Sequence, residues 1–317
     1  MRPLGYKSLS FLHGEYLTLP DLFADFKRTK DYLVCIDADG CMMDNMEVKH
    51  KECFCPAFVD AFDLQAASRY ARECWEYVNL YSRNRGCHRF RAVTKALRLF
   101  YARPEVRERE LPVIDVSPME HWVEETETLS HPALEAYING HPDCHESLRR
   151  SLAWSAELEE FVNRIVRGIT PFPHVKDVLS KLREKADVVL VSATRHETLL
   201  KENEPTGVAE LFHFITGQEY GTKAQIIARL LAIGGYDKEK VLKIGDAPGD
   251  HEAAQENGVL FYPVIPTEES LSWKHLERNA ADAFFAGSYA QELMPQTLDA
   301  FYKKLLEDVP WETSAAL

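Results

Sequence analysis

Short apolar runs alternate with longer helix-like segments through the second half of the chain. Four β-branched or aromatic runs, at residues 186–192, 212–216, 241–245 and 259–263, have the length and composition of buried strands. Residues 174–185, 194–204, 221–235 and 249–258 have the character of helices, and Thr194 and Glu197 stand at capping-box spacing. Strands that alternate with helices predict an α/β fold with a parallel sheet.

Residues 32–37 resemble the strands of this sheet, yet about 150 residues separate them from the next strand. Residues 46–168 have mostly helical periodicity. We therefore expect a core formed by residues 1–45 and 169–317, interrupted by a helical insertion at 46–168. Gly168, Pro171 and Pro173 predict a hinge where the chain returns to the core.

Composition narrows the possible partners and the compartment. The net charge of −13 argues against nucleic acid or an anionic membrane as partner, and no apolar run approaches the roughly 18 residues of a membrane span. The N-terminal stretch lacks the apolar core and cleavage site of a signal peptide. Seven cysteines, an odd number in a long chain, favour reduced thiols. We expect a cytoplasmic protein of undetermined oligomeric state.

Polar side chains follow the predicted strands. The stretch "LVCIDADGCMMD" places Asp37, Asp39 and Asp44 directly after the first strand, where repulsion and desolvation call for a cation. In a parallel sheet, ligands bind beyond the carboxyl ends of the strands. The residues expected at that edge are Asp37, Asp39, Ser192, Lys223, Asp246 and Asp250.

These residue types suit phosphoryl transfer. A carboxylate can accept a phosphoryl group, and Mg²⁺ prefers carboxylate and phosphate oxygens. A lysine, a hydroxyl and backbone N–H groups can neutralise and orient the transferred group. The sequence therefore predicts a magnesium-dependent phosphoryl-transfer site at this edge.

Four stretches, "DADGCMMD", "VSATR", "GTKAQII" and "GDAPGD", resemble in order the four motifs of the haloacid dehalogenase-like hydrolase superfamily. The resemblance extends over roughly residues 32–266 and implies a Rossmann-like core with helices on both faces. An insertion directly after the first motif resembles the helical C1-type cap. Cys41 departs from the family pattern, which usually has threonine there, and we expect little effect.

The resemblance also implies a role for each matching residue. Asp37 would be the nucleophile and a Mg²⁺ ligand, and Asp39 the general acid and base, with its backbone carbonyl facing the metal. Ser192 would bind the phosphoryl oxygens, and Lys223 would balance their charge and that of Asp37. The second metal carboxylate would be Asp246, with Asp250 completing the shell directly or through water.

An arginine-rich loop, "YSRNRGCHRFR", interrupts the helical insertion. It is either a solvated turn or a specificity loop in which Arg83 or Arg85 binds the substrate, since guanidinium groups suit phosphates and carboxylates. The nearby "HKECFC" is better explained as the start of the insertion than as a zinc site, because its spacing is short and no second ligand pair is close. The segment 217–223 lacks the Gly-Lys-Ser/Thr ending of a nucleotide-binding P-loop.

The resemblance implies a phosphatase that hydrolyses a small phosphorylated metabolite through an aspartyl phosphate. An aspartate at position 39 favours phosphate esters over carbon–halogen or carbon–phosphorus bonds. One alternative is a phosphomutase of the β-phosphoglucomutase type, in which a sugar hydroxyl replaces water. Another is a non-catalytic binding or regulatory protein that has kept the fold.

Overall fold

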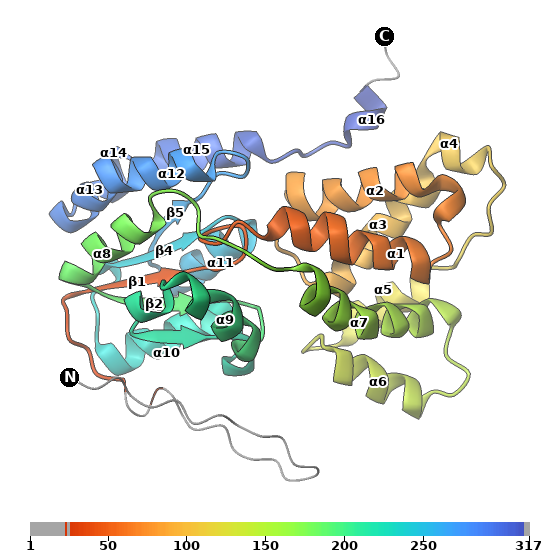
Figure 1. Cartoon of the computed structure of the whole chain (residues 1–317), viewed down its shortest axis with the longest axis horizontal. Helices are drawn as coiled ribbons and strands as arrows, with labels where there is room; N and C mark the ends of the chain where they lie inside the picture. The colour runs from red at the N-terminus through yellow and green to blue at the C-terminus, as the bar shows by residue number, and fades with distance from the viewer. Residues whose placement is uncertain (1–22, 24–25, 314–317) are drawn as a thin grey trace.

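The computed structural model describes residues 23 and 26–313 of the 317-residue chain. Its centre is a five-stranded sheet in the order β3-β2-β1-β4-β5, and every neighbouring pair is parallel (Figure 1). The strands are β1 (Tyr32–Ile36), β2 (Ala186–Val191), β3 (Phe214–Thr216), β4 (Val241–Gly245) and β5 (Leu260–Pro263). The predicted α/β fold with a parallel sheet is confirmed. Apolar runs suit such a sheet because helices bury both of its faces.

Helices alternate with these strands and continue beyond them. They are α8 (Val175–Lys185), α9 (His196–Asn203), α10 (Lys223–Gly234), α11 (Pro248–Asn257), α12 (Glu269–His275), α13 (Ala281–Ala286), α14 (Tyr289–Glu292), α15 (Met294–Lys304) and α16 (Pro310–Thr313). Along β1, Val34 and Ile36 pack into the core beneath α8, α12 and α13, whereas Leu33 and Cys35 face α10 and α11. This alternation is the two-residue period of a strand.

Local residue types explain one end of each of two helices, whereas the predicted start of a third helix is wrong. A capping box at Thr222 and Gln225 opens α10, and Gly258, with a φ of 65°, ends α11. The predicted capping box of Thr194 and Glu197 is wrong, because α9 begins after Arg195 with no side-chain cap. The Thr194 hydroxyl instead donates a hydrogen bond to Asp39 Oδ2 at 2.9 Å.

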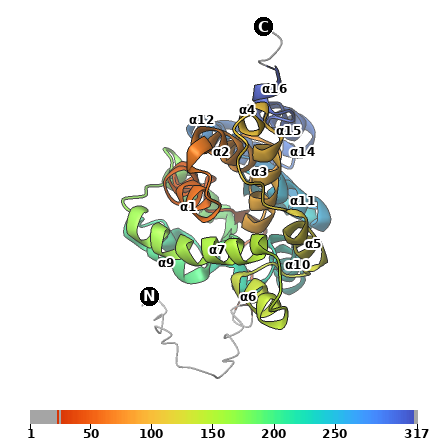
Figure 2. The ribbon, with the colours of Figure 1, turned by 90° about the vertical axis from the view of Figure 1, so that its right-hand side faces the viewer.

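The part of the sequence between β1 and β2 forms a second, all-helical body, which lies beside the sheet (Figures 1 and 2). It begins with a π-helical segment at Val48–Phe54, and a second π-helical segment lies at Tyr77–Tyr81. Its α-helices are α1 (Cys55–Ala61), α2 (Ser68–Glu76), α3 (Arg89–Ala102), α4 (Pro104–Arg107), α5 (Ser117–Glu125), α6 (His131–Gly140) and α7 (Glu146–Ile165). The body has its own core, in which the Trp75 ring lies 4.9 Å from that of Phe58 and 5.7 Å from that of Trp154.

Two connections lead from the sheet into this helical body and back, and they run side by side. The Asp44 N–H donates to the Thr170 carbonyl at 3.0 Å, and the Phe172 N–H donates to the Met42 carbonyl at 3.0 Å. Gly168, just before the returning connection, has a φ of 66°, in the left-handed region that glycine favours. The predicted hinge therefore lies where the outgoing and returning connections are hydrogen-bonded to each other.

Among the described residues, no helix combines the length and apolarity needed to cross a membrane. Residues 1–22, which form nearly all of the stretch used to exclude a signal peptide, lie outside the described part of the chain. The same is true of residues 24–25 and 314–317, which belong to the predicted core.

Candidate active site

The carboxyl edge of the sheet gathers the predicted polar residues. Because β1 pairs in register with both β2 and β4, residues that follow these three strands emerge next to one another. Asp37 and Asp39 follow β1, Ser192 follows β2, Lys223 opens α10, and Asp246 and Asp250 follow β4. The structure divides them into a carboxylate cluster, an ion network around Asp39, and Ser192 within its own loop.

Lys223 joins Asp37 to Asp250. Its ammonium nitrogen lies 2.6 Å from Asp37 Oδ2 and 2.7 Å from Asp250 Oδ1. The other oxygen of Asp37 accepts the Ala38 N–H at 2.8 Å, which fixes the carboxylate within its loop. Burial raises the pKa of Asp37 even though Lys223 opposes that shift. The pKa of Lys223 is raised, because its two carboxylate partners outweigh its own burial.

A second lysine, absent from the sequence prediction, contacts the same carboxylate. Lys243 lies fully buried within β4, and its Nζ is 2.8 Å from Asp250 Oδ1 and 3.0 Å from the Ile244 carbonyl oxygen. Burial would raise the pKa of Asp250, but the two lysines lower it to about 2. A charged residue inside the apolar run "VLKIG" was the available signal, because a central parallel strand buries both faces.

Three buried carboxylates converge beside these lysines. Oxygens of Asp37, Asp246 and Asp250 lie within 4.8 Å of one another. Asp246 Oδ1 and Asp250 Oδ2 are buried and have no hydrogen-bond partner. Burial, together with the charges of Asp37 and Asp250, raises the pKa of Asp246 to about 7, although Arg85 opposes the shift. Unpartnered carboxylate oxygens are costly to bury, and a hard divalent cation such as Mg²⁺ fits this donor set.

Asp39 belongs to a separate ion network. Its carboxylate accepts hydrogen bonds from Lys49 Nζ at 3.0 Å, Asn45 Nδ2 at 2.6 Å and Thr194 Oγ1 at 2.9 Å. Burial would raise the pKa of Asp39, but Lys49 and the hydrogen bonds lower it overall. Lys49 also contacts Glu202 of α9 at 2.9 Å. The side chain of Asp39 thus lies outside the three-carboxylate group, and the sequence predicted a metal contact only for its backbone carbonyl.

Lys49 and Glu202, like Lys243, are not predicted from the sequence. Lys49 is 5 % exposed and lies in the first helical segment of the insertion, ten positions after Asp39. Glu202 lies in α9, beyond the second strand of the sheet. Neither residue interrupts an apolar run, so only the packing of the insertion against α9 brings them together.

Ser192 is buried at the end of β2, 2 % exposed. Its N–H donates to the Thr216 carbonyl at 3.2 Å, and its Oγ accepts the Thr194 N–H at 3.2 Å. Cys41 is fully buried, and burial raises the pKa of its thiol. The Cys41 carbonyl accepts the indole N–H of Trp273 at 2.8 Å, so this residue supports the loop through its backbone.

The two arginines that were candidates for substrate binding lie in different environments, one buried and one exposed. Arg85 is 4 % exposed and reaches the cluster, with Nη2 at 2.7 Å and Nε at 2.8 Å from Asp246 Oδ2. Arg83 forms an exposed ion pair with Glu307, and its guanidinium lies 5.5 Å from the centre of the Tyr302 ring. The structure therefore brings Arg85, but not Arg83, to the carboxylates.

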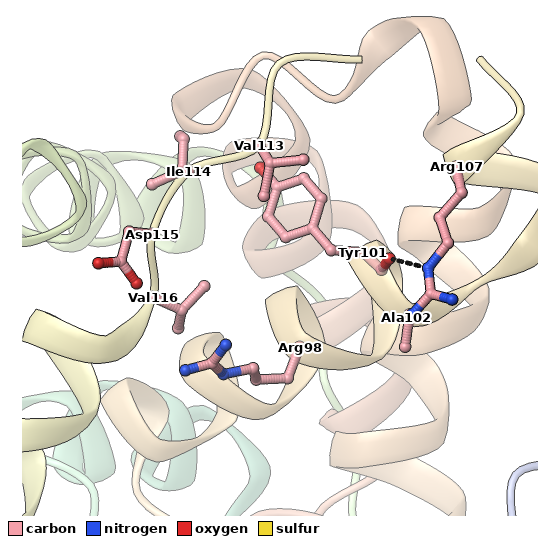
Figure 3. Close-up of a pocket in the computed structure, with 8 residues that line it drawn as sticks. All are labelled: Arg98, Tyr101, Ala102, Arg107, Val113, Ile114, Asp115 and Val116. Carbon is pink, nitrogen blue, oxygen red and sulfur yellow. Dashed lines mark hydrogen bonds between the residues drawn. The ribbon is translucent and has the colours of Figure 1, made fainter. Parts of the chain in front are cut away.

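Of two further cavities, one lies in the helical body and the other borders the ion network around Asp39. A cavity of about 440 Å³ is lined by α3, α4 and residues 113–116 of the helical body, among them Arg98, Tyr101 and Arg107 (Figure 3). A smaller cavity of about 140 Å³ lies between the end of α7 and α9 and includes Glu202. Among the described residues, the groups of three or more possible metal ligands include no residue of "HKECFC".

The family model of haloacid dehalogenase-like hydrolases matches residues 118–264, just under half of the chain. The matched stretch contains Ser192, Lys223, Asp246 and Asp250, and it begins after Asp37. No curated protein sequence matches the chain significantly.

Several solved structures are also similar to this chain. A protein assigned as a phosphoglycolate phosphatase, from Lactobacillus delbrueckii subsp. bulgaricus, is 17 % identical with a TM-score of 0.46, over 74 % of this chain and 87 % of its own. One assigned as a β-phosphoglucomutase, from Thermotoga maritima, is 16 % identical with a TM-score of 0.39, over 74 % of this chain and 85 % of its own. A haloacid dehalogenase-like family hydrolase from Xanthomonas campestris is 15 % identical with a TM-score of 0.43, over 83 % and 96 %.

Proposed function

Because the chain belongs to the haloacid dehalogenase-like hydrolase superfamily, we propose that it is a Mg²⁺-dependent phosphatase of a small phosphorylated metabolite. The observation that carries the proposal is the contact of Lys223 with both Asp37 and Asp250, beside buried carboxylate oxygens that have no partner. Residues 46–168 would form a C1-type cap over a core of residues 1–45 and 169–317.

Asp37 is the proposed nucleophile. One of its oxygens attacks phosphorus, the bond from phosphorus to the leaving oxygen breaks, and an aspartyl phosphate forms. Lys223 holds the attacking carboxylate at 2.6 Å and remains as a cation beside the transferred group. Ser192 and the backbone N–H groups of the loop after β1 would orient the phosphoryl oxygens.

Asp39 is the proposed acid and base. It protonates the departing alkoxide, and as a carboxylate it then takes a proton from the water that hydrolyses the aspartyl phosphate. Its present contact with Lys49, at 3.0 Å, stabilises the carboxylate form. Asp39 must therefore leave Lys49 before it can donate a proton, and movement of the cap relative to α9 would provide that release.

Asp37, Asp246 and Asp250 would hold Mg²⁺, together with the backbone carbonyl of Asp39. When bound there, Mg²⁺ would neutralise charge on the phosphoryl oxygens. Arg85, which already reaches Asp246, is the proposed contact of the cap with the substrate. Arg83 remains a second, more distant candidate.

A phosphate-release screen over phosphorylated metabolites, with Mg²⁺ and with excess EDTA, tests the proposal. We expect Mg²⁺-dependent release from at least one substrate and none from the folded Asp37→Asn variant. Absence of turnover on every compound would instead support a binding or regulatory role. A dependence on a sugar bisphosphate activator, with isomerised sugar phosphate as product, would identify the phosphomutase alternative.

A further inference from the structure

The chain crosses back from the sheet to the helical body at its C-terminal end (Figure 1). We call residues 305–311 the C-terminal strap. Its starting point is fixed on the core, because Phe301 of α15 is fully buried with its ring 6.2 Å from that of Phe261. The next residue, Tyr302, is hydrogen-bonded through its hydroxyl to His251 Nδ1 at 2.8 Å.

The strap pairs with the arginine-rich loop of the helical body. The Leu306 N–H donates to the Tyr81 carbonyl at 2.8 Å, and the Arg83 N–H donates to the Leu306 carbonyl at 3.1 Å. One residue further on, the Glu307 carbonyl accepts the Tyr77 hydroxyl at 2.7 Å. Backbone bonds on both sides of Leu306 therefore bind the strap to this loop without help from the Leu306 side chain.

The far end of the strap is anchored in the helical body. The Trp311 ring lies 5.6 Å from the Tyr77 ring and 4.4 Å from the guanidinium carbon of Arg103, a residue that is 4 % exposed. Val309 packs with Trp311 against the aromatic core of that body. These contacts tie the two bodies together at a place distinct from the paired connections at Met42–Asp44 and Thr170–Phe172.

The loop held by the strap is the one that carries Arg85 to the carboxylates. The Arg85 N–H donates to the Ser82 carbonyl at 3.0 Å, and its Nη1 donates to the Leu80 carbonyl at 3.0 Å. Gly86 has a φ of 75°, and a Cβ there would lie 2.5 Å from Ala247 Cβ. The loop is therefore bounded by the strap on one side and by the Asp246–Ala247 turn on the other.

We propose that the C-terminal strap positions Arg85, by holding the loop of residues 82–87 against the carboxyl edge of the sheet. A body joined to the core only by the two connections could rotate about them and withdraw this loop. A second attachment at Leu306 and Trp311 restricts that rotation. The effect of the strap on substrate binding rests on the proposed phosphatase function, whereas the effect of the strap on the loop does not.

A matched pair of variants tests the proposal in the full-length protein. Leu306→Pro removes the N–H that donates to Tyr81 and fixes the local φ, whereas Leu306→Ala keeps both hydrogen bonds. The Leu306 side chain is 41 % exposed, so its truncation alone should change little. Trp311→Ala, which removes the far anchor without altering the backbone, replaces Leu306→Pro if that variant does not fold.

Hydrogen exchange is the first measurement. In Leu306→Pro we expect the amides of residues 82–87 to exchange about tenfold faster or more, with β1 and β4 unchanged and Leu306→Ala at the wild-type rate. Unchanged exchange in the loop of a folded Leu306→Pro variant would overturn the proposal. Equal acceleration in the proline and alanine variants would overturn it too, because the backbone pairing would then not be the cause.

Binding of inorganic phosphate in the presence of Mg²⁺ is the second measurement. We expect Leu306→Pro and Arg85→Ala each to weaken it severalfold, with no further loss in the double variant. On a substrate found by the screen, Leu306→Pro should raise KM more than it lowers kcat. Faster loop exchange with unchanged phosphate affinity would refute the positioning of Arg85. A wild-type protein that binds no phosphate would instead count against the proposed function. The hydrogen-exchange result alone would then decide whether the strap holds the loop.

Discussion

Lys243 and Asp250 form a fully buried ion pair, with the lysine Nζ 2.8 Å from Asp250 Oδ1. The pair changes the charge balance of the whole cluster. The carboxylates of Asp37, Asp246 and Asp250 are matched in number by three cations, Lys223, Lys243 and Arg85. A divalent cation bound there would create an excess of positive charge that a phosphate dianion could neutralise.

Lys243→Met should therefore tighten Mg²⁺ binding. A unit charge a few ångströms from the cation contributes on the order of 1–4 kcal/mol, so we expect at least about a fivefold lower Kd by titration calorimetry. Lys240→Met is the matched control, because Lys240 is partly exposed just before the same strand and pairs with Asp237 rather than with the cluster. An unchanged Kd in Lys243→Met would show that Lys243 does not set the cation affinity.

Asp37→Asn should abolish catalysis and preserve the fold. Loss of a nucleophile lowers kcat by roughly a thousandfold or more. Burial raises the pKa of Asp37, which means that its charged form is penalised, so a neutral amide of the same shape should be tolerated. Phosphate release and the Tm, measured on the same preparation, check both statements, and a retained wild-type rate would contradict the assignment of Asp37.

Lys49→Met should be strongly destabilising, because it removes a buried cation from between the carboxylates of Asp39 and Glu202, which are only 19 % and 10 % exposed. Breaking such a buried pair lowers the free energy of unfolding by about 3–5 kcal/mol, measured by urea denaturation. Lys51→Met should lower it by less than about 1 kcal/mol, since Lys51 pairs with Glu47 near the surface. Adding Glu202→Gln to Lys49→Met should restore part of the loss, whereas strictly additive effects would disprove the coupling.

Asp187 should make stability depend on pH in the acid range. This buried carboxylate accepts hydrogen bonds from the Thr29 N–H at 2.9 Å and the Tyr236 hydroxyl at 2.6 Å. Burial would raise the pKa of Asp187, but these bonds lower it overall. A lowered folded-state pKa stabilises the protein above the ordinary aspartate pKa, and that contribution is lost as the pH falls through the folded-state value.

We therefore expect Asp187→Asn to lower the free energy of unfolding by about 1–3 kcal/mol at pH 7, and the difference from wild type to shrink below about pH 4. Both proteins should carry His213→Gln, because His213 Nε2 lies 3.2 Å from Asp187 Oδ1 and would titrate as well. A difference that stays constant down to pH 3 would rule out Asp187 as the titrating group.

Local sequence patterns were enough to predict the sheet and its polar edge. The apolar runs that became β2 and β4 are short, contain β-branched residues and are bounded by polar residues, which favours a buried strand over a buried helix. Residues that directly follow parallel strands meet at one edge whatever the details of packing. For this reason Asp37, Lys223, Asp246 and Asp250 could be expected close together from their positions alone.

The interactions missed from sequence depend on packing between distant segments. Thr194 was expected to cap α9, but its hydroxyl contacts Asp39, whose position depends on another strand. Lys49 meets Glu202 only because the helical body packs against α9. Leu306 pairs with Tyr81 and Arg83 across more than two hundred positions, and no periodicity in either segment signals that pairing.

The sequence by itself determined the parallel sheet, the helical insertion and the carboxylates at the strand ends, because each depends on neighbours within a few positions. Only the tertiary structure decided the partners of those carboxylates: Lys243 beside Asp250, Lys49 beside Asp39, and Arg85 beside Asp246. A buried charge must find its counter-charge wherever the fold supplies one. That choice depends on how the helical body and the C-terminal strap pack against the sheet.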